Sequence, residues 1–144
     1  MQNMKTAIAT PDAPPALGPY SQGVKVGDFV FVSGQLPIDP KSGQIISGGI
    51  GAQTEQVLLN IREILEEGQS SLKDVAKITI YLKDLAHFAE VNRVYELFFP
   101  NNEFNPIVPP ARSTVEVSRL PRDAEIEMEA IAILSGGYID SEIY

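Results

Sequence analysis

Two segments of the chain carry apolar residues at the three- and four-residue spacing of an amphipathic helix. In residues 50–67 the apolar positions are Val57, Leu58, Ile61, Ile64 and Leu65, and Gly68 follows as a residue that ends helices. In residues 85–98 the apolar positions are Phe88, Val91, Val94, Tyr95 and Phe98, and Asp84 precedes them as a plausible N-cap. The pattern therefore predicts two helices.

Alternating and β-branched runs predict strands over residues 5–9, 23–26, 29–33 and 75–82. The second and third of these flank Gly27 and Asp28, which predicts a hairpin. Gly34 directly after this hairpin indicates a bulge or a close backbone approach. Residues 110–129 alternate twice around a turn at 120–123, and we expect a second hairpin there, with Arg112 on its first strand.

The predicted order is hairpin, helix, strand, helix, hairpin, which indicates an α+β fold with one mostly antiparallel sheet and two helices on one face. A length of 144 residues suits one domain. Two helices leave the other face of the sheet without cover, and we expect oligomerisation through it.

Composition excludes several classes of protein. A net charge of −8, with 11 scattered lysines and arginines, opposes binding to nucleic acid or an anionic membrane. No apolar run approaches a membrane span, and prolines occupy the N-terminal segment where an export signal needs an apolar centre, so we expect a cytoplasmic protein. There is no cysteine, and a histidine-based site would depend on His87 alone, for which a solvated or capping role is expected.

Taken alone, single residues leave more than one interpretation open. Arg112 suits either an anion site or a surface ion pair with a nearby glutamate. Tyr20, held after Pro19, is explained as a loop anchor with its ring on the core. Asn92 lies within a predicted helix, where it faces solvent or has a partner. A row of three glutamates, Glu125, Glu127 and Glu129, shares one face of a strand, and a solvent-exposed face explains the row equally well.

Four motifs together resemble one family. They are Gly18-Pro19-Tyr20-Ser21-Gln22, Ser33-Gly34-Gln35, Phe88-Ala89-Glu90-Val91-Asn92 and Pro110-Ala111-Arg112-Ser113, in this order. The chain resembles the RidA (YjgF/YabJ) family of enamine/imine deaminases over residues 4–134. The resemblance implies a domain over residues 1–134, with a chorismate-mutase-like fold, and a C-terminal tail over 135–144. It also implies a homotrimer with sites between subunits, and hydrolysis of 2-iminopropanoate or 2-iminobutanoate to the 2-keto acid and ammonia without cofactor or metal.

The resemblance also implies roles for individual residues. Arg112 would grip the substrate carboxylate, and Glu127 would serve the attacking water. The substrate-binding positions would be Tyr20, Ser33, Gly34, Asn92 and Thr114. Threonine at 114 departs from the cysteine of many members, and the loop over residues 100–109 is longer than is typical.

The chemistry fits these residue types. A guanidinium binds a carboxylate bidentately, and one glutamate can take a proton from water and return it to the departing nitrogen. In an idealised second hairpin, however, Arg112 and Glu127 point to opposite faces. Either a bulge resets the register or the pair meets across a subunit interface, which we favour.

Three other functions remain to be weighed. The same pocket would serve a non-enzymatic trimer that binds metabolites or regulates a partner protein. A ribonuclease or translation inhibitor is opposed by the net charge. A chorismate mutase rests on fold analogy alone.

Overall fold

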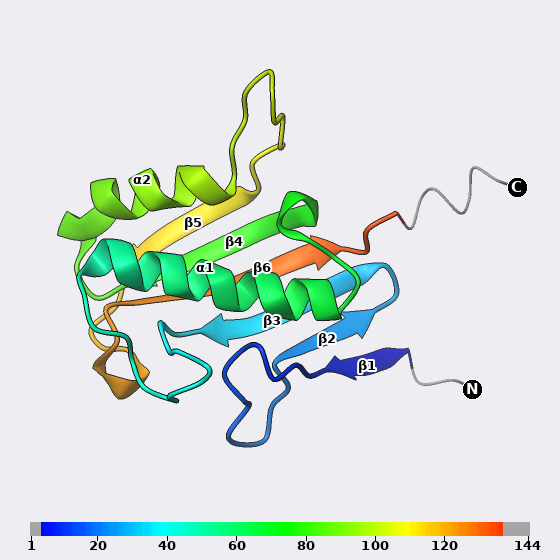
Figure 1. The fold of residues 1–144 in the computed structure, drawn as a ribbon, viewed down its shortest axis with the longest axis horizontal. Coiled ribbons are helices and arrows are strands. Elements are labelled where there is room, and N and C mark those ends of the chain that lie inside the picture. Colours follow the sequence, from blue (N-terminus) through cyan, green and yellow to red (C-terminus); the bar gives the residue numbers. More distant parts are fainter. Residues whose placement is uncertain (1–3, 137–144) are drawn as a thin grey trace, which may run out of the picture.

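The computed structural model describes residues 4–136. The strands are β1 (Lys5–Ile8), β2 (Gly23–Val26), β3 (Phe29–Gln35), β4 (Val75–Leu82), β5 (Ala111–Glu116) and β6 (Ile126–Ile133), and the helices are α1 (Ile50–Glu67) and α2 (Phe88–Phe98). The strands form one sheet in the order β1-β2-β3-β6-β4-β5. Every pairing is antiparallel except that of β4 with β5 (Figure 1). The predicted α+β fold with one mostly antiparallel sheet is confirmed.

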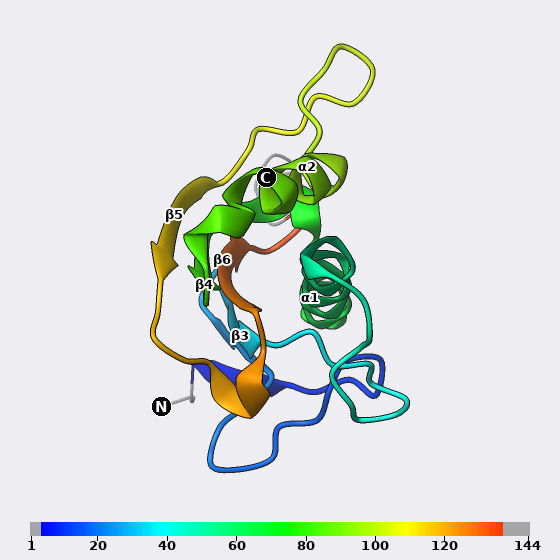
Figure 2. The same cartoon turned by 90° about the vertical axis from the view of Figure 1, so that its left-hand side faces the viewer.

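Both helices cover the same face of the sheet, as predicted (Figure 2). The fully buried side chains of α1, among them Leu58, Ile61 and Leu65, pack on the inward residues of β4 and β6, such as Ile78, Ile80 and Met128. The helix at 85–98 begins with a 3-10 turn over Leu85–His87, in which the Asp84 side chain accepts a hydrogen bond from the N–H of Ala86. Helix α1 has the predicted bounds, because its apolar periodicity is unbroken up to Gly68.

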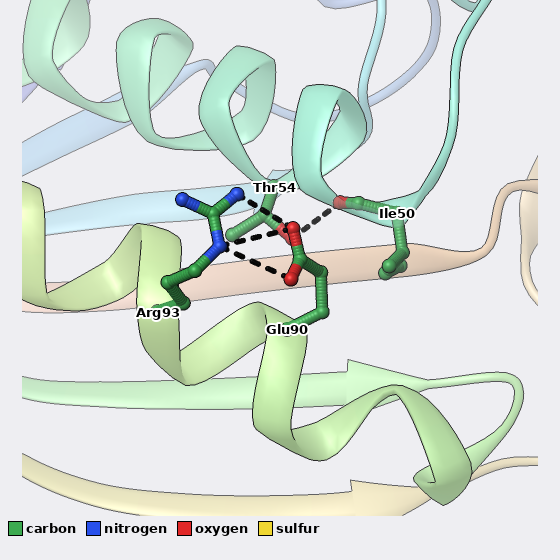
Figure 3. A network of polar contacts seen from close by, with 4 residues as sticks. All are labelled: Ile50, Thr54, Glu90 and Arg93. Carbon is green, nitrogen blue, oxygen red and sulfur yellow. Dashed lines mark hydrogen bonds and ion pairs between the residues drawn. The ribbon is translucent and has the colours of Figure 1, made fainter.

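The two helices approach each other closely at the start of α1. The Glu90 carboxylate of α2 accepts three hydrogen bonds from Arg93 and extends towards α1 (Figure 3). A Cβ added to Gly51 would lie 2.7 Å from Oε1 of Glu90. The first turn of α1 contains no acidic residue, and its N-cap Gly49 offers no side chain. Glu90 therefore supplies the negative charge that a helix N-terminus favours, and hydrogen bonding from Arg93 lowers the pKa of that carboxyl.

The predicted second hairpin is wrong. β5 and β6 are not neighbours, because β4 lies between them and pairs with both. β5 runs parallel to β4 at the edge of the sheet and is reached through α2, so β4, α2 and β5 form a crossover unit. The predicted turn is a 3-10 turn over Pro121–Asp123 that carries the chain past β4 to β6.

The other face of the sheet is open within the described chain. Outward residues of β3, β5 and β6 expose large apolar side chains there: Phe29 is 50% exposed, Phe31 39%, Val115 42% and Ile133 41%. The register pairs Phe29 with Ile133 and Phe31 with Ile131, so these four side chains form one patch on β3 and β6. Val115 lies apart from it on β5, level with Tyr81 and Glu127. No helix among residues 4–136 is long and apolar enough to cross a membrane.

Candidate active site

Arg112 lies on the helix-covered side of the edge strand β5. It pairs with Ile78 of β4, which is fully buried beneath the helices. Its Nη1 donates a 2.7 Å hydrogen bond to Oδ1 of Asn92. The guanidinium carbon lies 5.4 Å from the ring centroid of Phe88 and 4.9 Å from that of Tyr95. The guanidinium is thus held by two aromatic rings and one amide.

Helix α2 supplies all three of these contacts. Phe88, Asn92 and Tyr95 are four and three residues apart, and so lie on one face of the helix. The sequence leaves open whether Asn92 faces solvent or has a partner, and the structure gives it Arg112. The apolar pattern assigns Phe88 and Tyr95 only to the core-facing stripe of the helix. Their spacing around Asn92 is the signal that could have placed them beside the arginine.

Tyr95 forms the inner wall of this arginine site. Only 7% of it is exposed, and burial raises the pKa of its hydroxyl to about 12 although the Arg112 charge lowers it. Its ring stacks on Phe99 at 4.6 Å between centroids. Thr114, two residues after Arg112, lies half-buried on the same side of β5.

Glu127 lies on the opposite, open face of the sheet. It pairs with Tyr81, whose hydroxyl donates to the Glu129 carboxylate at 3.1 Å. Burial raises the pKa of the Glu127 carboxyl, and the neighbouring charge of Glu129 raises it further. A carboxyl in this state can hold a proton closer to neutral pH than an ordinary glutamate, which suits acid–base chemistry.

Gly34 makes room for the Glu127 carboxylate. The β3–β6 register shifts between Val32 and Gln35, which confirms the predicted bulge, and Gly34 lies within it. A Cβ at this position would lie only 2.0 Å from Oε2 of Glu127. The glycine is therefore required by close approach to a side chain.

Ser33 and Gln22 hold the loop that carries Tyr20. The Ser33 hydroxyl donates to the Ser21 carbonyl, and its backbone N–H donates to the Gln22 carbonyl. The buried Gln22 amide donates to the carbonyls of Thr10, Ala13 and Pro14 and accepts from the N–H of Thr10. Tyr20 itself is 54% exposed, next to the strand that carries Gly34. Gln22 belongs to the first motif, which gave it no role of its own, and the structure shows that it is a positioning residue of this loop.

The predicted site residues therefore fall into two groups. Arg112, Asn92 and Thr114 form one group on the helix-covered side of β5. Glu127 and Gly34 form the other on the open side, with Ser33 and Tyr20 near them. The strand β4 separates the groups, so one chain does not bring Arg112 and Glu127 together. Their opposite orientation agrees with the alternation pattern, although the intervening strand was not foreseen.

The described residues contain no group of three or more histidine, cysteine, aspartate or glutamate side chains that could hold a metal ion. Within residues 4–136, the arrangement offers an anion site and a carboxyl with a raised pKa. These groups suit proton transfer on a small carboxylate.

Known proteins match this chain over most of its length. A family model described as endoribonuclease L-PSP matches residues 10–134. A RutC family protein of Pyrococcus abyssi is 55% identical over 89% of this chain and 96% of its own. A 2-iminobutanoate/2-iminopropanoate deaminase of Salmonella typhimurium is 48% identical over 90% of this chain and 98% of its own.

A solved structure gives the same result. TdcF of E. coli, crystallised with bound serine, superposes with a TM-score of 0.83 at 41% identity, over 90% of this chain and 99% of that one. Both comparisons therefore cover most of the chain. The chain belongs to the RidA/YjgF family, whose family model bears the description endoribonuclease L-PSP.

Proposed function

We propose that this protein hydrolyses 2-imino acids, such as 2-iminopropanoate and 2-iminobutanoate, to 2-keto acids and ammonia. The observation that carries the proposal is the state of Arg112. Among the described residues its guanidinium makes one hydrogen bond, to the neutral amide of Asn92, and no ion pair. A half-buried guanidinium without a carboxylate partner is a receptor for a small anion.

The substrate carboxylate would bind the free edge of this guanidinium. Charge-assisted hydrogen bonds of this kind contribute roughly 1.5–3 kcal/mol each. The serine bound by TdcF has the same arrangement of a carboxylate beside a nitrogen-bearing carbon. The relatives named as deaminases, at 47–48% identity, support the same substrate class.

Glu127 would carry the protons. It takes one from water as the water oxygen bonds to the carbon of the protonated imine, which gives a neutral carbinolamine. It then returns that proton to the nitrogen. As the carbon–nitrogen bond breaks, the carbinolamine hydroxyl passes its proton to the Glu127 carboxylate, which leaves the keto acid and ammonia, and the carboxyl finally releases this proton to the ammonia. Positioned acid–base catalysis of this kind contributes about 10²–10⁴-fold to a rate.

The site would be completed between subunits. Arg112 and Glu127 lie on opposite faces of one sheet, and the open face carries an apolar patch that no described element covers. A homotrimer that buries this patch would bring Arg112 of one subunit towards Glu127 of the next. Assembly would then be a condition for activity.

A ribonuclease function has less support. The family model bears that description, but 19 acidic residues against 11 lysines and arginines oppose a phosphate backbone. Salt-dependent binding of RNA at physiological ionic strength would reverse this judgement.

The test couples a threonine dehydratase to the purified protein and follows keto-acid formation. We expect acceleration by the wild type and none by Arg112→Ala, with the variant retaining its oligomeric state in gel filtration. An active Arg112→Ala variant contradicts the mechanism. No acceleration by stoichiometric wild type would favour a metabolite-binding role instead.

A further inference from the structure

A cavity of about 230 Å³ opens beside the Glu127 group. Tyr20 and Gly34 line it, and Gly34 is the residue against which the Glu127 carboxylate rests. The rest of the lining is mixed. Its apolar part comes from Leu17, Leu36, Ile38 and Pro121, together with Pro14 and Pro15. Its polar part comes from Gln22, Gln35 and Arg122, whose side chains donate to backbone carbonyls. A molecule whose reacting carbon lies near Glu127 would therefore have this cavity within reach of its side chain.

Buried amides hold two of the cavity's walls. Gln22, 5% exposed, binds the carbonyl of Pro14 and thereby fixes the loop that carries Leu17 and Tyr20. Asn60 of α1, 1% exposed, donates to the carbonyls of Leu36 and Ile38 at 3.2 and 2.9 Å. Buried polar side chains are costly unless they are hydrogen-bonded, and here each is used on a cavity-lining loop. The walls are preformed.

The third wall, Pro121–Asp123, is fixed in the same way. Gln53 of α1 accepts a hydrogen bond from the N–H of Glu125, just after this turn. Arg122 and Asp123 have φ of 57° and 56°, which is uncommon for residues other than glycine. The Arg122 side chain donates to the carbonyl of Gly43 at 3.0 Å and ties the turn to the neighbouring loop. Strained backbone held by such contacts is typical of functional sites.

We propose that this cavity is the specificity pocket for the side chain of the 2-imino acid, and that it favours branched aliphatic chains of leucine size over the methyl group of 2-iminopropanoate. The inference rests on the proposed function. The cavity is far larger than the ~30 Å³ share of one water, and smaller than the roughly 300–1,000 Å³ typical of pockets for drug-sized ligands. A methyl group leaves most of it empty, whereas an isobutyl group buries apolar surface against Leu36, Ile38 and Pro121.

The test compares two imines generated in situ by an L-amino-acid oxidase, from alanine and from leucine. We expect kcat/KM for the leucine imine to be at least about tenfold higher, since one methylene in an apolar pocket discriminates about 10–200-fold. Leu17 is 81% exposed, so Leu17→Trp should fold while its indole fills the mouth of the cavity. This variant should lose at least tenfold for the leucine imine and less than threefold for the alanine imine. Leu97→Trp, on the exposed side of α2 and outside this cavity, is the matched control and should change neither.

Two results overturn the inference while leaving the proposed hydrolysis intact. One is an unchanged ratio of the two kcat/KM values in Leu17→Trp. The other is a preference for the imine of aspartate, which would need Arg122 to leave Gly43 and bind a second carboxylate. If the wild type hydrolyses neither imine, the proposed function fails. In that case the pocket is tested by calorimetry, which measures the affinity of each protein for pyruvate and for 4-methyl-2-oxopentanoate. A tenfold loss of affinity in Leu17→Trp for the larger keto acid alone supports it, and equal affinities in both proteins reject it.

Discussion

Replacing Gly34 by alanine should disable the site without unfolding the protein. The added Cβ would lie 2.0 Å from Oε2 of Glu127, 2.9 Å from Cδ and 3.4 Å from Cγ. Favourable separations between non-bonded heavy atoms are about 3.5–4.0 Å, so the carboxylate must withdraw by more than about 1 Å. The clashing atoms are the far end of a flexible side chain, and Gly34 does not need a positive φ. The fold can therefore accommodate the methyl group, but the carboxylate cannot keep its place.

The catalytic consequence follows from that displacement. A misplacement of about 1 Å in a catalytic group costs roughly 10²-fold. We expect kcat for imine hydrolysis to fall by about this factor, while the thermal midpoint changes by no more than a few degrees. The matched control is Gly49→Ala, where an added Cβ meets nothing within 4 Å. It should lose a little stability at the start of α1 and keep its kcat.

The pH profile gives a second measurement of the same displacement. Burial, and then Glu129, raise the pKa of Glu127, so the acid limb of kcat/KM in the wild type should lie above the ordinary value of 4.5. A carboxylate pushed away from Gly34 loses part of that burial, and its acid limb should move down towards 4.5. A Gly34→Ala variant with kcat within threefold of wild type and an unchanged acid limb would refute this account of Glu127.

Three further substitutions probe separate parts of the site. Glu127→Gln should lower kcat by about 10²–10⁴-fold. It should also raise the thermal midpoint at pH 7. Because the folded-state pKa of Glu127 is raised, the wild type loses stability as pH rises from about 4.5 through that pKa, whereas the amide of the variant does not titrate. Equal midpoints at pH 7 would contradict this. Asn92→Ala removes the one hydrogen bond that the Arg112 guanidinium makes among the described residues. KM should rise about tenfold, which corresponds to the low end of the roughly 1.5–3 kcal/mol of a hydrogen bond to a charged group, with a smaller effect on kcat. An unchanged KM would show that the aromatic rings alone hold the guanidinium in place. Gln22→Leu leaves the carbonyls and N–H of the 10–14 loop without partners and should cost on the order of 3 kcal/mol in urea unfolding; a loss below about 1 kcal/mol would mean that the loop finds other partners.

Local patterns were sufficient for most of the fold. The apolar periodicity of residues 50–67 and Gly68 set the bounds of α1, and alternation set those of β4. The bulge at Gly34 could be predicted because a glycine within a strand usually marks a bulge or a close backbone approach. Each of these signals lies within one element or at its end.

Strand pairing was harder to predict from the sequence. Residues 110–129 were predicted to form a hairpin because two alternating runs flank a turn at 120–123. The prediction also agrees with the rule that consecutive strands are usually neighbours. The order of a strand, a helix of 11 residues and another strand over 75–116 is also typical of a parallel crossover, which is what forms. Which pairing wins depends on the whole sheet, in which β6 takes a central position between β3 and β4, and β5 takes the edge. No local pattern contains that choice.

Candidate site residues could be named one at a time from the sequence, but the environment in which the structure places them could not. The motifs identify Arg112 and Asn92, whereas the clamp of Phe88 and Tyr95 is hidden because apolar residues on a helix are usually core. Similarly, the cavity beside Gly34 depends on Gln22, Asn60 and Gln53 holding loops far apart in sequence. Contacts between residues so far apart in the sequence follow no periodic spacing, so the sequence pattern does not predict them.

The separation of Arg112 from Glu127 leads to a sharper prediction than the loss of either residue alone. If each site takes its arginine from one subunit and its glutamate from the next, Arg112→Ala and Glu127→Gln subunits are each defective in a different half. Mixed in equal amounts, unfolded and refolded together, they assemble at random. Half of the subunits keep Arg112 and half keep Glu127, so about one site in four receives both. Activity should return to about a quarter of wild type in the mixture, whereas each variant refolded alone stays inactive. If one chain supplied both groups, no mixed site would be complete, and an inactive mixture of correctly assembled oligomers would show that the two faces of the sheet do not meet across subunits.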